Sequence, residues 1–183
     1  MRVPVVPGVT PVALGAPERT AADLLEVLRR IKGTLDPGLE VSAVQAADLA
    51  HSHGAALLAV VEHPGADPAL LVAIVVPADR VPEAHLLHGP AIQDVTEGVT
   101  ATGHPVVIVE RIPVSGTGTQ LQVVVRAESV AVVFTVHSPT GRGWLDVSGV
   151  AGRFVSGIEF TGIGTRSVSR PRPGGTSARS ARR

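Results

Sequence analysis

Apolar residues recur at helical spacing soon after a proline-rich start. Intervals of four, three and four residues place four of them on one helical face: Leu24, Leu28, Ile31 and Leu35. Thr20 is a suitable N-cap residue and Gly33 a suitable stop. The pattern therefore predicts a helix over residues 20–33.

Two further N-terminal stretches are less regular. Residues 1–17 contain four prolines, so we expect an extended segment that lies along the body as an edge strand or hangs loose. Residues 39–54 fit a short strand followed by a helical turn, and their pattern does not decide between strand and helix.

Strand signals dominate the middle of the chain. Residues 55–62 and 69–76 are apolar at nearly every position, which is typical of strands covered on both faces. In the second half, three aliphatic segments follow one another closely and predict an antiparallel meander, with strands over 104–112, 120–127 and 130–137.

Two segments beside these strands have helical spacing. A weak helical stretch follows Pro82, breaks at Gly89 and resumes with three apolar residues on one face: Ile92, Val95 and Val99. A final helix is predicted over residues 146–157 with Asp146 as its N-cap. Two glycines, Gly149 and Gly152, weaken that helix by about 1 kcal/mol each, so packing must hold it, or the glycines let it approach the sheet closely.

Together these elements predict one α+β domain over residues 18–161. We expect an antiparallel sheet of about five or six strands with two or three helices packed on it. No apolar run approaches the roughly 20 residues of a membrane-spanning helix, and prolines interrupt the N-terminal pattern that an export signal would need. The cytoplasm is therefore the expected compartment.

Charge is divided unevenly along the chain. Residues 1–161 carry ten basic and 16 acidic side chains, a net charge of −6, whereas residues 162–183 carry +6. This Arg-rich tail contains Ser, Gly and Pro but little to bury, so we expect it to be disordered. Its six arginines are candidates for binding an anionic surface or nucleic acid: Arg166, Arg170, Arg172, Arg179, Arg182 and Arg183.

The histidines are the candidate metal ligands. The sequence has no cysteine, which excludes disulfides, thiolate metal sites and a thiol nucleophile. Two histidine pairs, His51 with His53 and His85 with His88, have spacings that could offer four imidazoles to a metal. The spacing matches no zinc signature, so structural histidines are the favoured interpretation.

Catalytic motifs are not evident. Gly116 and Gly118 lie between two predicted strands, which favours a hairpin loop over a phosphate-binding loop. The sequence has no nucleophile elbow, no zinc-protease motif and no P-loop lysine motif. We expect a protein without catalytic residues or cofactors, although a scattered active site stays open.

The second half of the chain resembles the PsbP-like fold family, including small actinobacterial proteins and lipoproteins. The resemblance is carried by the strand "GHPVVIVERI", the strand pair "LQVVVRAESVAVVFTVHSP" and the ending "GRGWLDVSGVAGRFVSGIEF". It covers about residues 54–160 and implies binding or assembly without catalysis. The chain departs from the lipoprotein members because it has no lipid-modified cysteine.

The favoured function is a non-catalytic protein-interaction or adaptor module of a bacterial assembly, with the Arg-rich tail contacting an anionic partner. One alternative is a metal-dependent enzyme or metal-binding protein that uses His51, His53, His85 and His88. A second alternative is nucleic-acid binding through the tail. Valine-rich sheet edges also make a homo-oligomer a candidate assembly.

Overall fold

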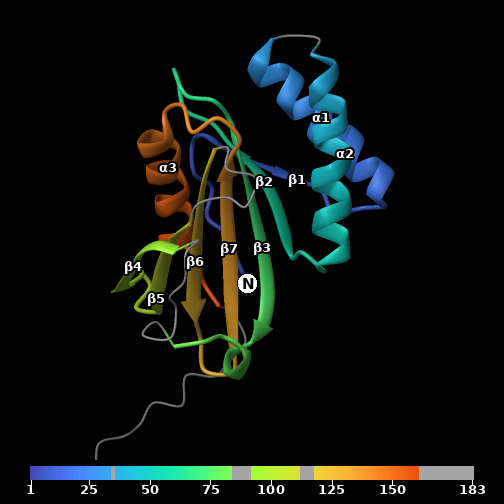
Figure 1. Ribbon diagram of the computed structural model, residues 1–183. Coiled ribbons are helices and arrows are strands. Elements are labelled where there is room, and N and C mark those ends of the chain that lie inside the picture. Colours follow the sequence, from blue (N-terminus) through green and yellow to red (C-terminus); the bar gives the residue numbers. More distant parts are fainter. Residues whose placement is uncertain (34–35, 84–91, 112–117, 161–183) are drawn as a thin grey trace, which may run out of the picture.

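The computed structural model describes residues 1–33, 36–83, 92–111 and 118–160 (Figure 1). Within these residues, three α-helices accompany a seven-stranded antiparallel sheet, which confirms the α+β class and adds a strand to the expected five or six. The helices are α1 (Pro17–Lys32), α2 (Pro37–Ser52) and α3 (Trp144–Ser156). None of them is long and apolar enough to cross a membrane.

The sheet has the order β1-β2-β3-β7-β6-β5-β4, and every neighbouring pair is antiparallel. Its strands are β1 (Val9–Val12), β2 (Leu57–Val61), β3 (Ala69–Pro77), β4 (Ile92–Val99), β5 (Pro105–Arg111), β6 (Thr119–Arg126) and β7 (Val130–Ser138). A short 3-10 helix, Ala78–Arg80, follows β3. The predicted meander is confirmed as β5-β6-β7, and the proline-rich start supplies the edge strand β1.

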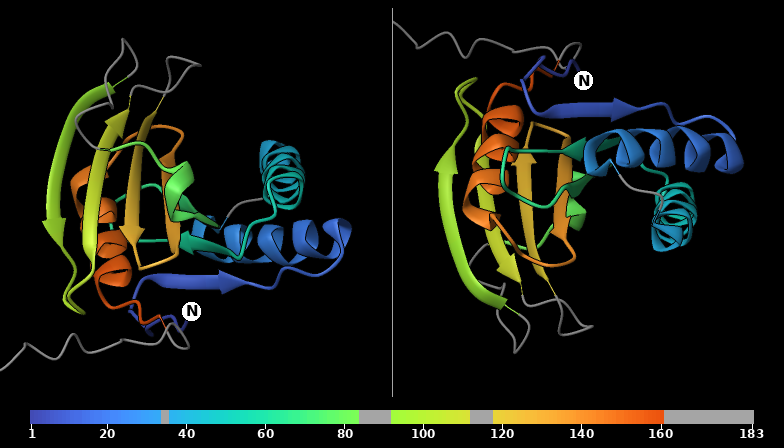
Figure 2. Two further views of the ribbon diagram at one scale, coloured as in Figure 1. Left: turned by 90° about the horizontal axis from the view of Figure 1, so that it is seen from below. Right: turned by 90° about the horizontal axis from the view of Figure 1, so that it is seen from above.

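Helix α3 lies on one face of the sheet, and helices α1 and α2 lie on the other (Figure 2). Strand β2 shows the division, because all five of its residues are buried while alternate side chains point to opposite faces. Leu57 and Ala59 belong to the core beneath α3, with Phe134 and Phe154. Leu58 belongs to a second core, together with residues of α1 and α2.

The predicted helix starts are wrong by two or three residues. Helix α1 begins at Pro17 after Ala16, so Thr20 lies inside it and is fully buried. The Thr20 hydroxyl accepts a hydrogen bond from the Gly15 amide at 3.1 Å and lies 3.2 Å from the Ala13 carbonyl, so it orders the turn before α1 instead of capping the helix. Helix α3 begins at Trp144, two residues before the expected Asp146.

Two stretches with ambiguous or weak patterns, residues 39–54 and 92–99, form regular elements. Residues 39–54 contribute to helix α2, whose N-cap Asp36 accepts a hydrogen bond from the Gly38 amide at 2.9 Å. The helical interpretation around Ile92, Val95 and Val99 is wrong, because these residues form β4.

The error at β4 has a physical origin. The register between β4 and β5 shifts between Ile92 and Asp94, which leaves one extra residue in the strand. The shift brings Ile92 and Val95 into the same hydrophobic cluster although they are three residues apart. A bulged strand thereby imitates the spacing of a helix.

Candidate functional site

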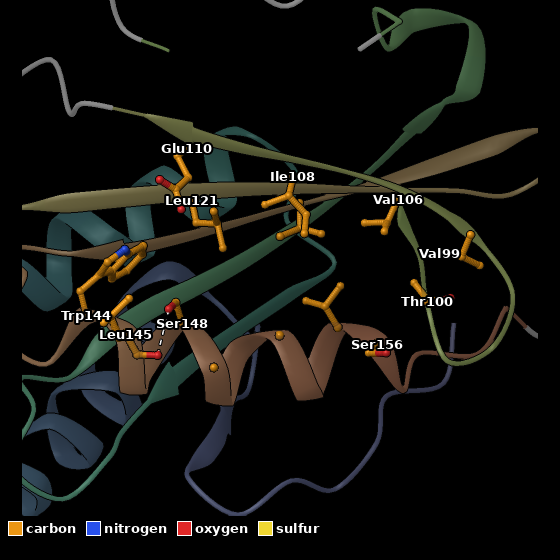
Figure 3. A pocket seen from close by; sticks show the side chains of 14 residues that line it. Val99, Thr100, Val106, Ile108, Glu110, Leu121, Trp144, Leu145, Ser148 and Ser156 are labelled. Carbon is orange, nitrogen blue, oxygen red and sulfur yellow. Dashed lines mark hydrogen bonds between the residues drawn. The ribbon is translucent and has the colours of Figure 1, made fainter. Parts of the chain in front are cut away.

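A groove of about 380 Å³ separates α3 from strands β5 and β6 (Figure 3). Its floor is formed by aliphatic side chains of the sheet: Val106, Ile108, Leu121 and Val123. Trp144 and Leu145 lie at one end, and Val99 and Thr100 lie at the other. We call this feature the α3 groove.

The groove forms because α3 places large side chains over one part of the sheet and small side chains over another. Large residues of the helix, including Val150 and Phe154, are buried against the core of β2, β3 and β7. The neighbouring face, which lies over β5 and β6, consists mostly of small residues: Ser148, Gly149, Gly152 and Ser156. Side chains of that size do not fill the space above Ile108, which stays only half-buried.

The two glycines of α3 do not serve close packing. A Cβ atom built on Gly152 meets no atom of the described residues within 4 Å. A Cβ atom on Gly149 meets only the Arg153 Nη1 atom, at 3.9 Å, which is an ordinary contact. The expectation that these glycines let the helix approach the sheet closely is therefore wrong. Gly157 differs, since a Cβ atom there would lie 3.1 Å from Pro4.

Hydrogen bonds fix the groove at its Thr100 end. The Ala101 amide donates to the Ser156 hydroxyl oxygen at 3.0 Å, and the Thr102 hydroxyl donates to the Ile158 carbonyl at 3.0 Å. These bonds tie the end of α3 to the turn between β4 and β5. They help to fix the position of this end of α3 over the sheet.

An acidic residue, Asp67, fixes the segment that leads into α3. It accepts a hydrogen bond from the Thr140 hydroxyl at 2.6 Å and pairs with Arg142 at 3.1 Å. The Thr140 hydrogen bond, helped by the positive charge of Arg142, lowers the pKa of Asp67 below its ordinary value. Gly143 follows with φ of 70°, and a Cβ atom there would overlap Ala66, so glycine is required at this turn.

The lining of the α3 groove is mostly apolar. Glu110 is the ionisable side chain among its described lining residues. The Ser148 hydroxyl donates to the Leu145 carbonyl at 3.1 Å, and Ser156 is engaged in the bond to Ala101. Among the described residues, no carboxylate or imidazole is hydrogen-bonded to either serine. Leu145 is 85% exposed and Val99 is 69% exposed, so apolar surface continues beyond both ends.

The candidate metal ligands His51 and His53 have separate structural roles. His51 Nε2 lies 3.1 Å from the Thr20 hydroxyl and so connects the end of α2 to the start of α1. His53 follows the last residue of α2, and its Nδ1 lies 2.9 Å from the Leu49 carbonyl. A carbonyl only accepts, so Nδ1 is the donor in this contact. In the part of the chain that the structure describes, no group of three His, Asp or Glu side chains is placed to hold a metal.

Two sets of predicted site residues lie outside the described residues. They are His85 and His88, and the six arginines of the tail: Arg166, Arg170, Arg172, Arg179, Arg182 and Arg183. Gly116 of the expected hairpin loop also lies outside, although the strands on either side of that loop, β5 and β6, pair as expected.

The α3 groove is the site that the sequence alone did not reveal. Its signal was the small residues of α3, where Gly149, Gly152 and Ser156 recur every three or four positions. The same spacing fits a helix that contacts its neighbour closely, so only the placement of the helix distinguishes the two. Comparison of the chain with protein-family models, with curated proteins and with solved structures found no match.

Proposed function

We propose that this protein is a non-catalytic interaction module whose α3 groove receives an apolar segment of a partner protein. The observation that carries the proposal is the pair Gly149 and Gly152, neither of which packs against the sheet among the described residues. Glycine inside a helix costs about 1 kcal/mol relative to alanine. A cost that brings neither a required backbone conformation nor close packing is typical of a functional surface.

The dimensions and rim of the groove favour a protein segment over a small ligand. Its volume is near the lower limit of small-molecule pockets, which measure roughly 300–1,000 Å³ and enclose most of the ligand. The exposed Leu145 and Val99 extend the apolar surface past both ends. A peptide that places two or three large apolar side chains in the groove would cover these ends as well.

Sheet edges are weaker candidates for the interaction. Strand β1 has four residues and includes Pro11, which has no amide hydrogen to donate. Strand β4 carries Asp94, Glu97 and a register shift, and charges and bulges of this kind discourage the addition of another strand. These features direct the proposal to the groove and away from self-association through strand pairing.

The partner of the tail, the family and the cellular setting are proposed from the sequence alone. The Arg-rich tail would supply a second, electrostatic contact to an anionic partner, with strong salt dependence. The resemblance to the PsbP-like family stays a prediction, and it implies binding or assembly without catalysis, in agreement with the groove. A bacterial assembly and the cytoplasm are the setting that we propose.

The chain offers a clean spectroscopic test. Trp144 is the only tryptophan, the sequence has no tyrosine, and Trp144 lines the groove, so its fluorescence reports occupancy directly. Peptides selected by phage display on the full-length protein would be synthesised and titrated while Trp144 emission is recorded. We expect selected peptides to contain two or three large apolar residues and to shift the emission saturably.

Two variants make the test specific. Gly152→Leu fills the groove, and we expect it to weaken binding at least tenfold, whereas Gln45→Leu adds the same side chain to an exposed position of α2 and should leave binding unchanged. Peptides that bind Gly152→Leu as tightly as the parent would overturn the proposal. A saturable Trp144 shift with palmitate, in the absence of any selected peptide, would also overturn it in favour of a lipid site.

A further inference from the structure

Helices α1 and α2 pack against each other (Figure 2). A second groove is lined by residues of both helices. It measures about 400 Å³. Its apolar floor includes Ala21, Leu25 and Val44, and Val44 is 46% exposed. We call this feature the acidic groove because three carboxylates form its rim: Glu18, Glu40 and Asp48.

The rim carboxylates differ in their ion pairing from the acids beside them. Asp23 pairs with Arg19 at 3.0 Å, and Glu26 pairs with Arg30 at 3.4 Å. Among the described residues, no cation lies within ion-pair distance of the three rim carboxylates. The groove thus combines an apolar floor with uncompensated negative charge, a surface suited to a cationic segment with aliphatic stems.

We propose that the Arg-rich tail, residues 162–183, docks into the acidic groove of its own molecule. The tail carries six arginines and no acidic side chain. Guanidinium groups bind carboxylates through paired hydrogen bonds, while the stems of the arginines would cover Leu25 and Val44. Pro171 and Pro173 alternate with Arg170 and Arg172 and favour an extended backbone that fits a groove.

The tail is long enough to reach the groove from the place where the body ends. The last described residue, Phe160, packs against His104 with a ring separation of 4.7 Å. Twenty-three further residues span about 75 Å when fully extended. A compact body of this size has a radius of gyration of only about 15 Å. Every point on its surface is therefore within reach of the tail.

The expected contact is weak and reversible. Each exposed ion pair strengthens binding by roughly 1.5- to 5-fold, so three pairs give a modest affinity for a free peptide. The tether compensates, because a short flexible connection gives an effective concentration in the millimolar range. Salt or a polyanion would then release the tail, so the body would compete with any anionic partner for the same arginines. This inference does not depend on the α3 groove.

Paramagnetic labelling of the full-length chain tests the inference directly. The sequence contains no cysteine, so Ser180→Cys gives a single attachment point for a nitroxide near the end of the tail. At low salt we expect selective broadening of amide signals from the acidic groove, including those of Ala22 and Val44. We expect 0.5 M NaCl to reduce the broadening at least fivefold.

Two charge variants provide the specificity control. The first neutralises the rim through Glu18→Gln, Glu40→Gln and Asp48→Asn, and we expect it to abolish the broadening. The second neutralises three exposed acids elsewhere through Asp79→Asn, Glu97→Gln and Glu128→Gln, and it should leave the broadening in place. Equal loss in both variants, or no selective broadening at low salt, would overturn the inference. So would equal broadening in a mixture of isotope-labelled and spin-labelled chains, because the tail of another copy would then occupy the groove.

Discussion

Replacing Gly152 by alanine examines the physical basis of the α3 groove. The added methyl group meets no described atom within 4 Å, and the backbone of Gly152 does not adopt a left-handed conformation. Alanine therefore brings its helix propensity without a steric cost. We expect Gly152→Ala to raise the free energy of unfolding by about 1 kcal/mol, and Gly149→Ala to do nearly the same.

The effect is large enough to measure. A change of 1 kcal/mol moves the melting temperature of a chain of this length by about 2–4 °C. Urea denaturation followed by helical circular dichroism gives the free energy, and an unchanged m-value confirms that the denatured state is not affected. Gly143→Ala is the control, since φ of 70° and overlap with Ala66 should make it destabilising. Destabilisation by Gly152→Ala would refute the reasoning, because the helix would then need glycine for packing.

Three further predictions address other parts of the structure. Thr140→Val removes the hydrogen bond that lowers the pKa of Asp67, so it should cost about 1 kcal/mol at pH 7 in urea denaturation. A lowered carboxyl pKa stabilises the fold above its unfolded value near 3.9, and this stabilisation is lost as the pH falls through the lowered folded value. The difference from the parent should therefore shrink when the denaturation is repeated at increasingly acidic pH, and a difference that grew in acid would contradict the assignment. His51→Ala should lower the free energy of unfolding by about 1 kcal/mol in urea denaturation, because it removes the contact with Thr20. Micromolar zinc should not raise the melting temperature of the parent. A zinc-dependent rise that is lost in His51→Ala would restore the metal hypothesis. Leu145→Ser should change the free energy of unfolding by less than about 0.5 kcal/mol because Leu145 is 85% exposed. It should still lower the affinity of the selected peptides for the α3 groove, as measured by titration of Trp144 emission. Unchanged affinity would show that this end of the groove is not part of the interface.

Sequence patterns predicted the fold best where one physical effect dominates. The alternation in residues 130–137 predicted β7, whose side chains divide between the two faces of the sheet. The apolar spacing of Leu24 and Leu28 predicted the buried face of α1. In these elements, burial of one face decides both the structure and the pattern.

The predictions from the sequence were wrong or undecided where two different structures produce the same pattern of residues. A bulge in β4 gave Ile92 and Val95 the spacing of a helix, and pairing with β5 determines the strand. Thr20 has the side chain of an N-cap, yet tertiary contacts bury it inside α1. Residues 39–54 are apolar on several sides and did not distinguish helix α2 from a strand.

The candidate site depends on the surroundings of the two glycines of α3. A local sequence pattern does not show these surroundings. Gly149 and Gly152 are compatible with a closely packed helix or with an open groove. Only the position of α3 over β5 and β6, held by the Ser156 and Thr102 hydrogen bonds, selects the groove. The same limit applied to the histidines, because their spacing did not show that His51 contacts Thr20.

The reactivity of a cysteine placed at Gly152 tests the central claim most directly, because the chain has no other thiol. The rate of modification of Gly152→Cys by a disulfide reagent would be compared with that of Gln45→Cys, which is exposed on α2. We expect the two rates to agree within about threefold in the free protein, and a selected peptide to protect Gly152→Cys alone by at least tenfold. A buried, slowly reacting thiol in the free protein, or a thiol that no groove-binding peptide protects, would contradict an open groove that receives a partner.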